Sequence, residues 1–175
     1  MSKRKSKLQK GFTLIEIMIN MAIIAILTLY VYGYARRGTE KAYLVRAKVE
    51  MKVMERALRA YQIEYEALPA DVSRNIPPGI EQYLSQSDID KWPNGPWVGS
   101  VYDYDAFMSE GVQTYQISIR FCEIGQPDTC RFPRESWASD FDVNSSVYMC
   151  LEGACKSHPN QPLNHPGYCI NCYEN

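Results

Sequence analysis

The sequence predicts an α+β fold in which a long N-terminal helix is followed by a small, disulfide-bearing antiparallel β-sheet. Three observations predict it. Residues 12–32 are almost wholly apolar, and helical periodicity then continues to about residue 65. Between residues 115 and 122, apolar and polar side chains alternate, as in a half-buried strand.

Charge and cysteine are distributed unevenly along the 175 residues. Residues 1–11 carry five basic side chains and no acid, residues 36–59 carry eight basic and three acidic ones, and residues 60–175 carry six basic and sixteen acidic ones. All six cysteines lie in the last third of the chain. The hydrophobic share of 46% excludes a wholly disordered chain. The distribution indicates a basic tail, an apolar helix, a basic helix and an acidic head, and it disfavours an evenly composed cytosolic enzyme.

The apolar tract FTLIEIMINMAIIAILTLYVY has the length of a membrane span. A helix of this length measures roughly 30 Å, the thickness of a hydrocarbon core. Tyrosines near its C-terminal end, followed by Arg36 and Arg37, are typical of a membrane interface. Because more basic residues precede the tract than directly follow it, we expect a cytoplasmic N-terminus and a head outside. A cleavable secretory signal peptide does not fit, since residues 30–38 are bulky and basic.

A single carboxylate, that of Glu16, lies near the start of this tract. Placing an unpaired carboxylate in a membrane costs several kcal/mol unless it reaches a partner or the surface. Such a residue indicates a functional site. A short basic leader that ends in Lys10 and Gly11 precedes the tract, and Phe12 is its first residue.

The segment Lys10–Gly11–Phe12–Thr13–Leu14–Ile15–Glu16 resembles the prepilin signal of type IV pilins and type II secretion pseudopilins. In that family the prepilin peptidase, a membrane aspartyl protease, cuts after the glycine, and the new N-terminal phenylalanine is methylated. The acid at the fifth mature position helps to align neighbouring subunits in a filament. The resemblance places the cut between Gly11 and Phe12 and gives Glu16 the assembly role. Many relatives have a proline where this chain has Ala22.

The resemblance implies a type IV pilin-like fold of four segments. These are a cleaved basic leader (1–11), a transmembrane assembly helix (12–35), an amphipathic helix (36–68) and a loop-rich antiparallel β head (69–175). Expected partners are the prepilin peptidase, identical or related pilin subunits, the inner-membrane assembly machinery and the membrane itself. The expected location is the bacterial inner membrane before assembly, and a periplasmic or cell-surface filament afterwards.

The second helical segment has an apolar face and a basic face. The apolar residues recur at steps of three and four: Ala47, Met51, Met54, Leu58, Tyr61 and Tyr65. Beside them runs a basic stripe of Lys48, Lys52, Arg56 and Arg59. The stripe favours a solvated helix face; a nucleic-acid footprint and pairing with an acidic neighbour are the alternatives. Leu68 and Pro69 are expected to end the helix.

The strands expected in the head are short. Residues 101–107 are rich in aromatic side chains, and residues 115–122 alternate. A turn at residues 125–128 is expected to lead into a return strand that begins at residues 130–132. Residues 147–149 form a further expected strand. His158 and His165 lie among prolines and asparagines, which is typical of solvated loops.

The cysteines favour disulfides, because the head is expected outside the cytoplasm. Local sequential pairing is the simplest of the fifteen connectivities: Cys122–Cys130, Cys150–Cys155 and Cys169–Cys172. A zinc knuckle is the alternative, since C-x2-H and C-x2-C pairs have ligand spacing; it would use Cys155, His158, Cys169 and Cys172. Redox catalysis by the C-x2-C pair is disfavoured, because the pair does not open a helix.

Calcium is the cofactor that the resemblance allows, since major pseudopilins bind it in the head. Four acids could supply oxygen ligands, although no ligand loop of defined spacing is visible: Asp88, Asp90, Asp103 and Asp105. The sequence contains no nucleophile elbow, phosphate-binding glycine loop or H-E-x-x-H motif, and therefore it does not indicate an enzyme.

These observations favour a structural filament subunit of a type IV pilus or of a type II secretion pseudopilus. Two alternatives stay open. One is a minor pilin that binds DNA for uptake, and the other is a membrane-anchored zinc or redox protein that does not polymerise. The charge of −10 on residues 60–175 disfavours nucleic acid as a partner. The sequence separates neither pilus from pseudopilus nor a major from a minor subunit.

Overall fold

The computed structural model describes residues 11–90, 92 and 94–172. The chain divides into two compact units, and the boundary lies between Thr39 and Glu40. Residues 1–10 of the expected basic leader lie outside the described residues.

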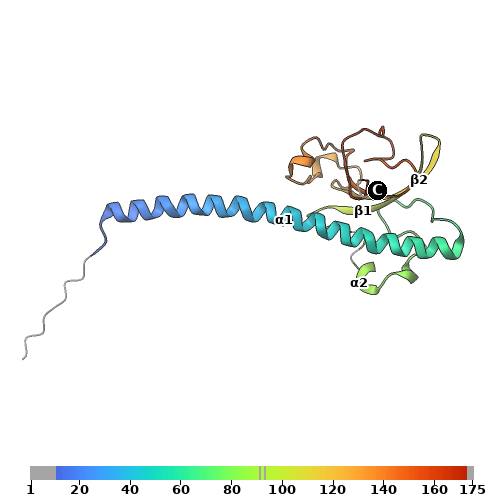
Figure 1. Ribbon diagram of the computed structural model, residues 1–175, viewed down its shortest axis with the longest axis horizontal. Coiled ribbons are helices and arrows are strands. Elements are labelled where there is room, and N and C mark those ends of the chain that lie inside the picture. The colour runs from blue at the N-terminus through green and yellow to red at the C-terminus, as the bar shows by residue number, and fades with distance from the viewer. Residues whose placement is uncertain (1–10, 91, 93, 173–175) are drawn as a thin grey trace, which may run out of the picture. The chain divides into compact units, whose positions relative to one another are not determined.

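The two expected helical segments form one continuous helix, α1 (Leu14–Tyr65), which is labelled in Figure 1. The helix ends three residues before the expected end at Leu68. Glu66, the next residue, has a φ of 56°, the left-handed conformation that commonly closes a helix. Leu68 and Pro69 are buried beyond that point.

The helical part of the first unit is exposed around its whole circumference. The large apolar side chains of residues 14–34 are between 46% and 78% exposed. The chain thus contains one helix in its described part that is long and apolar enough to cross a membrane.

The described part of the second unit contains a four-stranded sheet in the order β1-β2-β3-β4. Its strands are β1 (Val101–Ser109), β2 (Val112–Arg120), β3 (Val147–Glu152) and β4 (Tyr168–Cys169). The first three pair antiparallel, as expected, whereas β4 pairs parallel with β3. The sheet is therefore mixed, because the long loop at residues 153–167 returns the chain in the direction of β3.

The central hairpin differs from the expected one. Residues 130–132 form no strand, so the expected return strand is wrong; Arg131 N–H makes a single backbone bond to Phe121 O at 2.9 Å. Instead β2 pairs with β1 across Glu110 and Gly111, which have φ of 50° and 77°. Two successive positive φ values are those of a type I′ turn, whose twist suits a two-residue hairpin.

Short helices fill the loops of the second unit. The segment before the sheet contains η1 (Glu81–Tyr83) and α2 (Gln86–Ile89). Ser85 caps α2, since its side chain accepts a hydrogen bond from Asp88 N–H. The segment between β2 and β3 contains η2 (Pro127–Thr129) and η3 (Ser136–Ala138).

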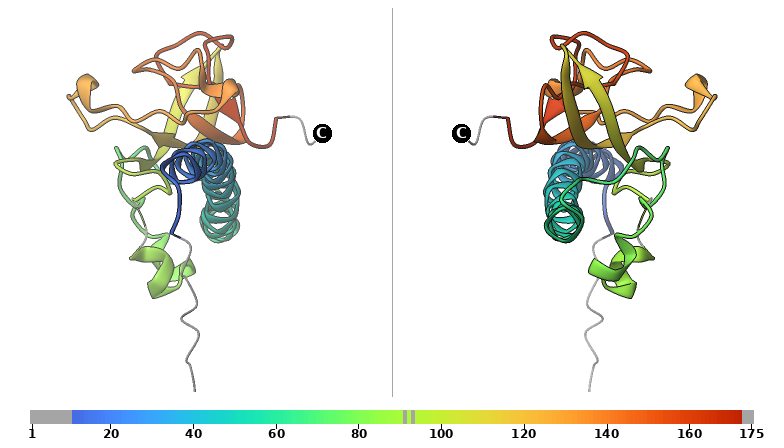
Figure 2. Two further views of the ribbon diagram at one scale, coloured as in Figure 1. Left: turned by 90° about the vertical axis from the view of Figure 1, so that its left-hand side faces the viewer. Right: turned by 90° about the vertical axis from the view of Figure 1, so that its right-hand side faces the viewer.

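The hydrophobic core of the second unit lies between α1 and one face of the sheet, and both views of Figure 2 show the sheet on one side of the helix. The expected apolar helix face is confirmed for its first four residues, which are buried: Ala47, Met51, Met54 and Leu58. Tyr61 is half-buried, and Tyr65 is exposed. The sheet contributes Tyr102, Tyr104, Ile117, Ile119, Val147 and Met149. Burial of each such side chain contributes about 1.5–3 kcal/mol to the stability of the head.

Candidate assembly site and head framework

The residues of the expected processing motif lie at the start of α1. Gly11, Phe12 and Thr13 are not helical, and Leu14 is the first helical residue. Phe12 is 80% exposed, and apart from the two neighbouring residues no described atom lies within 4 Å of the position that a Cβ on Gly11 would take. The Gly11–Phe12 peptide bond therefore lies in accessible chain directly before the helix.

Glu16 has a partner within its own chain. Its Oε2 accepts hydrogen bonds from the N–H and the hydroxyl of Thr13, each at 2.8 Å. In return, Glu16 N–H donates to Thr13 Oγ1 at 3.3 Å. This reciprocal pattern is a capping box, with Thr13 as N-cap and Glu16 as the third helical residue. Thr13 is a residue that the sequence reasoning missed, although its T-x-x-E signal is present before an apolar run.

The capping box leaves part of the carboxylate available. Both bonds from Thr13 end on Oε2, and Oε1 accepts no hydrogen bond from the described residues. One oxygen can therefore complete the helix start while the other accepts a donor from a second chain.

Three acids of α1 hold aromatic side chains of the head. Trp97 Nε1 donates to Glu40 at 2.8 Å, Tyr102 OH to Glu50 at 2.7 Å, and Tyr83 OH to Glu64 at 2.5 Å. The bonds satisfy the polar atoms of rings that otherwise contribute apolar surface. Burial, with the bond to Glu50, raises the pKa of the Tyr102 hydroxyl, and the bond to Glu64 raises the pKa of Tyr83 to about 12.

A further contact joins α1 to the end of β3. Arg59 donates to Glu152 Oε1 at 2.5 Å and to Leu151 O at 2.8 Å, and Gln62 donates to the same Glu152 oxygen at 2.9 Å. The bonds from Gln62 and Arg59 lower the pKa of Glu152. Lys52 is paired as well, with Glu55 at 3.0 Å. Because two members of the basic stripe already have acidic partners, the stripe is a weak candidate for a nucleic-acid footprint.

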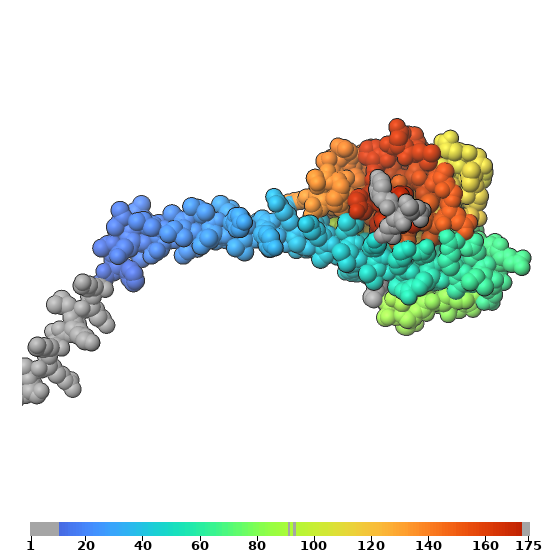
Figure 3. Space-filling model, in the orientation of Figure 1, coloured from blue at the N-terminus to red at the C-terminus, as the bar shows by residue number. Residues whose placement is uncertain are grey.

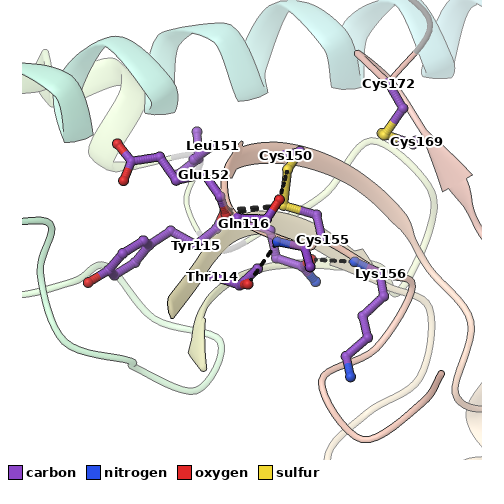
Figure 4. The surroundings of a disulfide bond; sticks show 12 residues. Thr114, Tyr115, Gln116, Cys150, Leu151, Glu152, Cys155, Lys156, Cys169 and Cys172 are labelled. Carbon is purple, nitrogen blue, oxygen red and sulfur yellow. Dashed lines mark hydrogen bonds between the residues drawn. A yellow bond between two sulfur atoms is a disulfide. The ribbon is translucent and has the colours of Figure 1, made fainter. Parts of the chain in front are cut away.

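The structure pairs the cysteines locally, as Cys122–Cys130, Cys150–Cys155 and Cys169–Cys172. The Cys150–Cys155 bridge lies beside β2, to which the neighbouring backbone is bonded (Figure 4). There Ala154 N–H donates to Thr114 Oγ1 and Lys156 N–H to Gln116 Oε1, both at 3.0 Å.

The zinc alternative does not fit this pairing. Three of its four ligands are cysteines held in disulfides, and zinc binds thiolates. Within the described residues, no group of three or more His, Cys, Asp or Glu side chains could hold a metal ion.

Arg120 is the centre of a buried polar network on the sheet face that points away from α1. Its guanidinium binds Asp105 at 2.8 and 3.0 Å and Asp103 at 3.2 Å. It also donates to Ser157 O at 3.0 Å and so fastens the 153–167 loop over the sheet. The Arg120 side chain is only 7% exposed. Burial, together with the charge of Asp105, raises the pKa of Asp103.

The four acids considered for calcium all accept hydrogen bonds from protein donors. Gln116, Ser118 and Arg120 donate to Asp105, and Arg120 and the backbone of Arg74 donate to Asp103. Asp88 and Asp90 belong to the α2 segment, where Ser85 and Gln86 donate to them. Calcium needs six to eight oxygen ligands around one point, and protein donors already occupy these carboxylates.

His165 lies between Asp142 and Ser157. Its Nε2 is 3.2 Å from Asp142 Oδ2, and its Nδ1 is 3.0 Å from Ser157 Oγ. These are the residue types of a hydrolytic triad, but Ser157 is 0% exposed, so a substrate does not reach its hydroxyl. The three residues instead tie two loops together. The expectation of a solvated loop histidine is therefore wrong for His165, whose side chain is 14% exposed.

Comparison with known proteins gives a consistent result. A family model described as the prokaryotic N-terminal methylation motif matches residues 6–32. The type II secretion system core protein G of Vibrio cholerae is 30% identical over 108 residues, which are 58% of this chain and 73% of that protein. The protein of the same name from Pseudomonas aeruginosa is 31% identical over 111 residues, 59% of this chain and 78% of that protein. The one from Escherichia coli K12 is 28% identical over 102 residues, 54% of this chain and 70% of that protein. No solved structure gives a significant match.

Proposed function

The chain belongs to the family of type II secretion system core protein G, and from that premise we propose that it is a pseudopilus subunit that is cut after Gly11, methylated on Phe12 and polymerised through α1. As in its relatives, its role is that of a pilin-like filament subunit and not of an enzyme. The proposed partners are the prepilin peptidase, further copies of this chain or related pseudopilins, and the secretion system's inner-membrane machinery.

The observation that carries the proposal is that an accessible peptide bond lies directly before an exposed apolar helix. The Gly11–Phe12 bond precedes the first helical residue, and the part of α1 that follows, residues 14–34, exposes all of its large apolar side chains. Non-helical, accessible chain is what a protease requires. An apolar helix of this length is stable only when lipid or other helices surround it. Cleavage, membrane residence and lateral packing therefore all begin at the same end of α1.

The proposed location follows from charge and cysteine chemistry. The basic leader favours a cytoplasmic N-terminus and a single-pass orientation with the head outside. The six head cysteines are all in disulfides, which persist in an oxidising compartment. The subunit is thus proposed to reside in the inner membrane before assembly and to enter a periplasmic filament on assembly.

The test uses the full chain expressed with a prepilin peptidase, followed by N-terminal sequencing and intact mass. We expect a mature protein that begins with a methylated Phe12. Gly11→Val should stay uncut, because it places a branched side chain beside the bond, and it should keep its fold, because open space surrounds Gly11. Gly33→Ala is the matched control: that position is also open, and processing should be normal. A mature chain that begins at Met1, or beyond Tyr30, would contradict the proposal.

A further inference from the structure

One face of α1 in the second unit is exposed although it is partly apolar. It is defined by Lys41, Val45, Lys48, Val49, Lys52 and Arg56, and is called the basic-apolar face below. Figure 3 shows that one side of this part of α1 lies open at the surface of the unit. Val45 and Val49 are 64% and 60% exposed, and Ile63, which follows at helical spacing, is 83% exposed. The helix buries the opposite face, with Met51, Met54 and Leu58, against the sheet.

This stretch of α1 carries more basic than acidic side chains. Residues 41–59 carry six basic and two acidic side chains. Lys52 is paired with Glu55, but Arg56 uses its Nε to bind Lys52 O and has no acidic partner among the described residues. Exposed aliphatic side chains that alternate with cations are suited to an acidic protein surface, on which the valines can pack while the cations find carboxylates.

The chain itself presents such an acidic surface. At the C-terminal end of α1, Glu64 and Glu66 are exposed, and so is Glu81, the first residue of η1. The bond from Tyr83 OH to Glu64 holds η1 beside the helix end. These three acids are called the acidic end below. Residues 60–90 carry six acidic side chains and one basic one, Arg74, whose guanidinium binds Cys122 O.

We propose that the basic-apolar face of one subunit packs against the acidic end of a second copy of this chain. The inference rests on the proposed function and adds the contact between heads to it. A second copy displaced by about 20 Å along the helix axis, the distance from Lys52 to Glu66 at 1.5 Å per residue, brings the two patches together.

The relation between the two patches favours a filament over a closed dimer. The basic-apolar face and the acidic end are different surfaces of the same molecule. Two different complementary surfaces form a heterologous contact. In a pair of subunits, one molecule still has a free basic-apolar face and the other a free acidic end, so that further copies can add and an open chain grows. A membrane surface or DNA could neutralise the cations, but neither would explain why a matching acidic patch lies on the same molecule, at the end of α1 and the start of η1.

The experiment measures filaments formed by the full chain in cells that contain the prepilin peptidase and the assembly machinery. Lys52→Glu with Arg56→Glu should cause loss of sheared filaments, and so should Glu66→Lys with Glu81→Lys. The four changes combined should restore filaments, because the charges are exchanged between the patches. Glu110→Lys with Glu123→Lys is the matched control. Both acids are exposed and distant in sequence from the acidic end, Glu110 shares the positive φ of Glu66, and filaments should be normal.

Disulfide trapping gives a second readout. All native cysteines are paired, so that only introduced thiols can cross-link copies. Val49→Cys combined with Glu66→Cys should give a ladder of covalent multimers on oxidation, whereas Val49→Cys combined with Glu110→Cys should not.

The possible outcomes separate the two proposals. A parent chain that forms no filaments would contradict the proposed function. A parent that forms filaments, beside reversal variants that assemble equally well, would overturn only the head contact. A third outcome is that Lys52→Glu with Arg56→Glu forms normal filaments but no longer binds anionic vesicles or duplex DNA. That result would assign the face to the lost ligand and would also overturn the contact.

Discussion

Thr13 and Glu16 close the first turn of α1 on each other, since the amide and hydroxyl of Thr13 both donate to Glu16 Oε2 at 2.8 Å. Glu16 thus has a local role that is independent of any filament. The assembly role that the prepilin resemblance implies for Glu16 would require a second donor, and the amine that cleavage would create on Phe12 of a neighbouring copy is the chemical group suited to it. Because capping leaves Oε1 without a donor among the described residues, the two roles are compatible.

The two roles of Glu16 can be separated by substitution. Glu16→Gln keeps a side chain that can cap the helix but removes the charge, whereas Thr13→Ala removes the cap and keeps the charge. We expect normal membrane levels and cleavage for both variants and for Glu16→Ala. Filaments should be scarce for Glu16→Ala and Glu16→Gln, because an uncharged partner does not fix the register of the amine. Thr13→Ala should still assemble. Equal loss in Thr13→Ala and Glu16→Gln would instead identify capping as the whole role of Glu16.

Loss of the Cys122–Cys130 bridge should weaken the head measurably. The bridge spans eight residues, and the loop entropy that it removes from the unfolded chain corresponds to about 2–3 kcal/mol. Cys122→Ser with Cys130→Ser should therefore lower the free energy of unfolding of the detergent-solubilised protein by that amount in urea titrations. Cys169→Ser with Cys172→Ser opens a loop of only three residues and should cost less, about 2 kcal/mol. A titratable thiol in correctly exported parent protein would contradict the pairing.

Arg120 should be among the most sensitive positions in the head. Arg120→Leu leaves the carboxylates of Asp103 and Asp105 buried without their cation, and breaking a buried ion pair in this way costs about 3–5 kcal/mol. The thermal midpoint of the head should fall accordingly. Arg131→Leu, at an exposed position, is the control and should change the midpoint little. Adding Asp103→Asn and Asp105→Asn to Arg120→Leu should recover part of the loss, because no unpaired charge then remains buried.

The contact between Arg59 and Glu152 should make part of the stability depend on pH. Because Gln62 and Arg59 lower the pKa of Glu152, its contribution is fully present above the unfolded pKa of about 4.3 and is lost as pH falls through the lower folded value. The Glu152 side chain is 40% exposed, so that water screens the pair and the contribution stays below about 1 kcal/mol. Glu152→Gln should therefore be less stable than the parent at about pH 7, and the difference should disappear as pH falls through the folded pKa of Glu152. Glu123→Gln, at an exposed acid, should match the parent throughout this pH range.

The sequence alone determined the features that depend on neighbouring residues. The apolar tract, the periodic face from Ala47 to Leu58 and the alternation in β2 each follow from side chains a few positions apart, and the structure has a helix or a strand at each of them. The processing motif is equally local. The capping box of Thr13 and Glu16 belongs to the same class, because its partners lie within one helical turn.

Only the tertiary structure decided which distant segments pair. A turn at residues 110–111 and a turn at residues 125–128 both satisfy local rules, and the choice depends on which strand completes the core beneath α1. The parallel pairing of β4 with β3 depends on the path of a long loop, which local propensity does not specify. Arg120 and His165 gained their roles in the same way, since their partners are 15 to 37 and 8 to 23 residues away. A buried charge or imidazole is stable only where folding brings its partners to it, and that requirement is met by the whole head and not by any segment of its sequence.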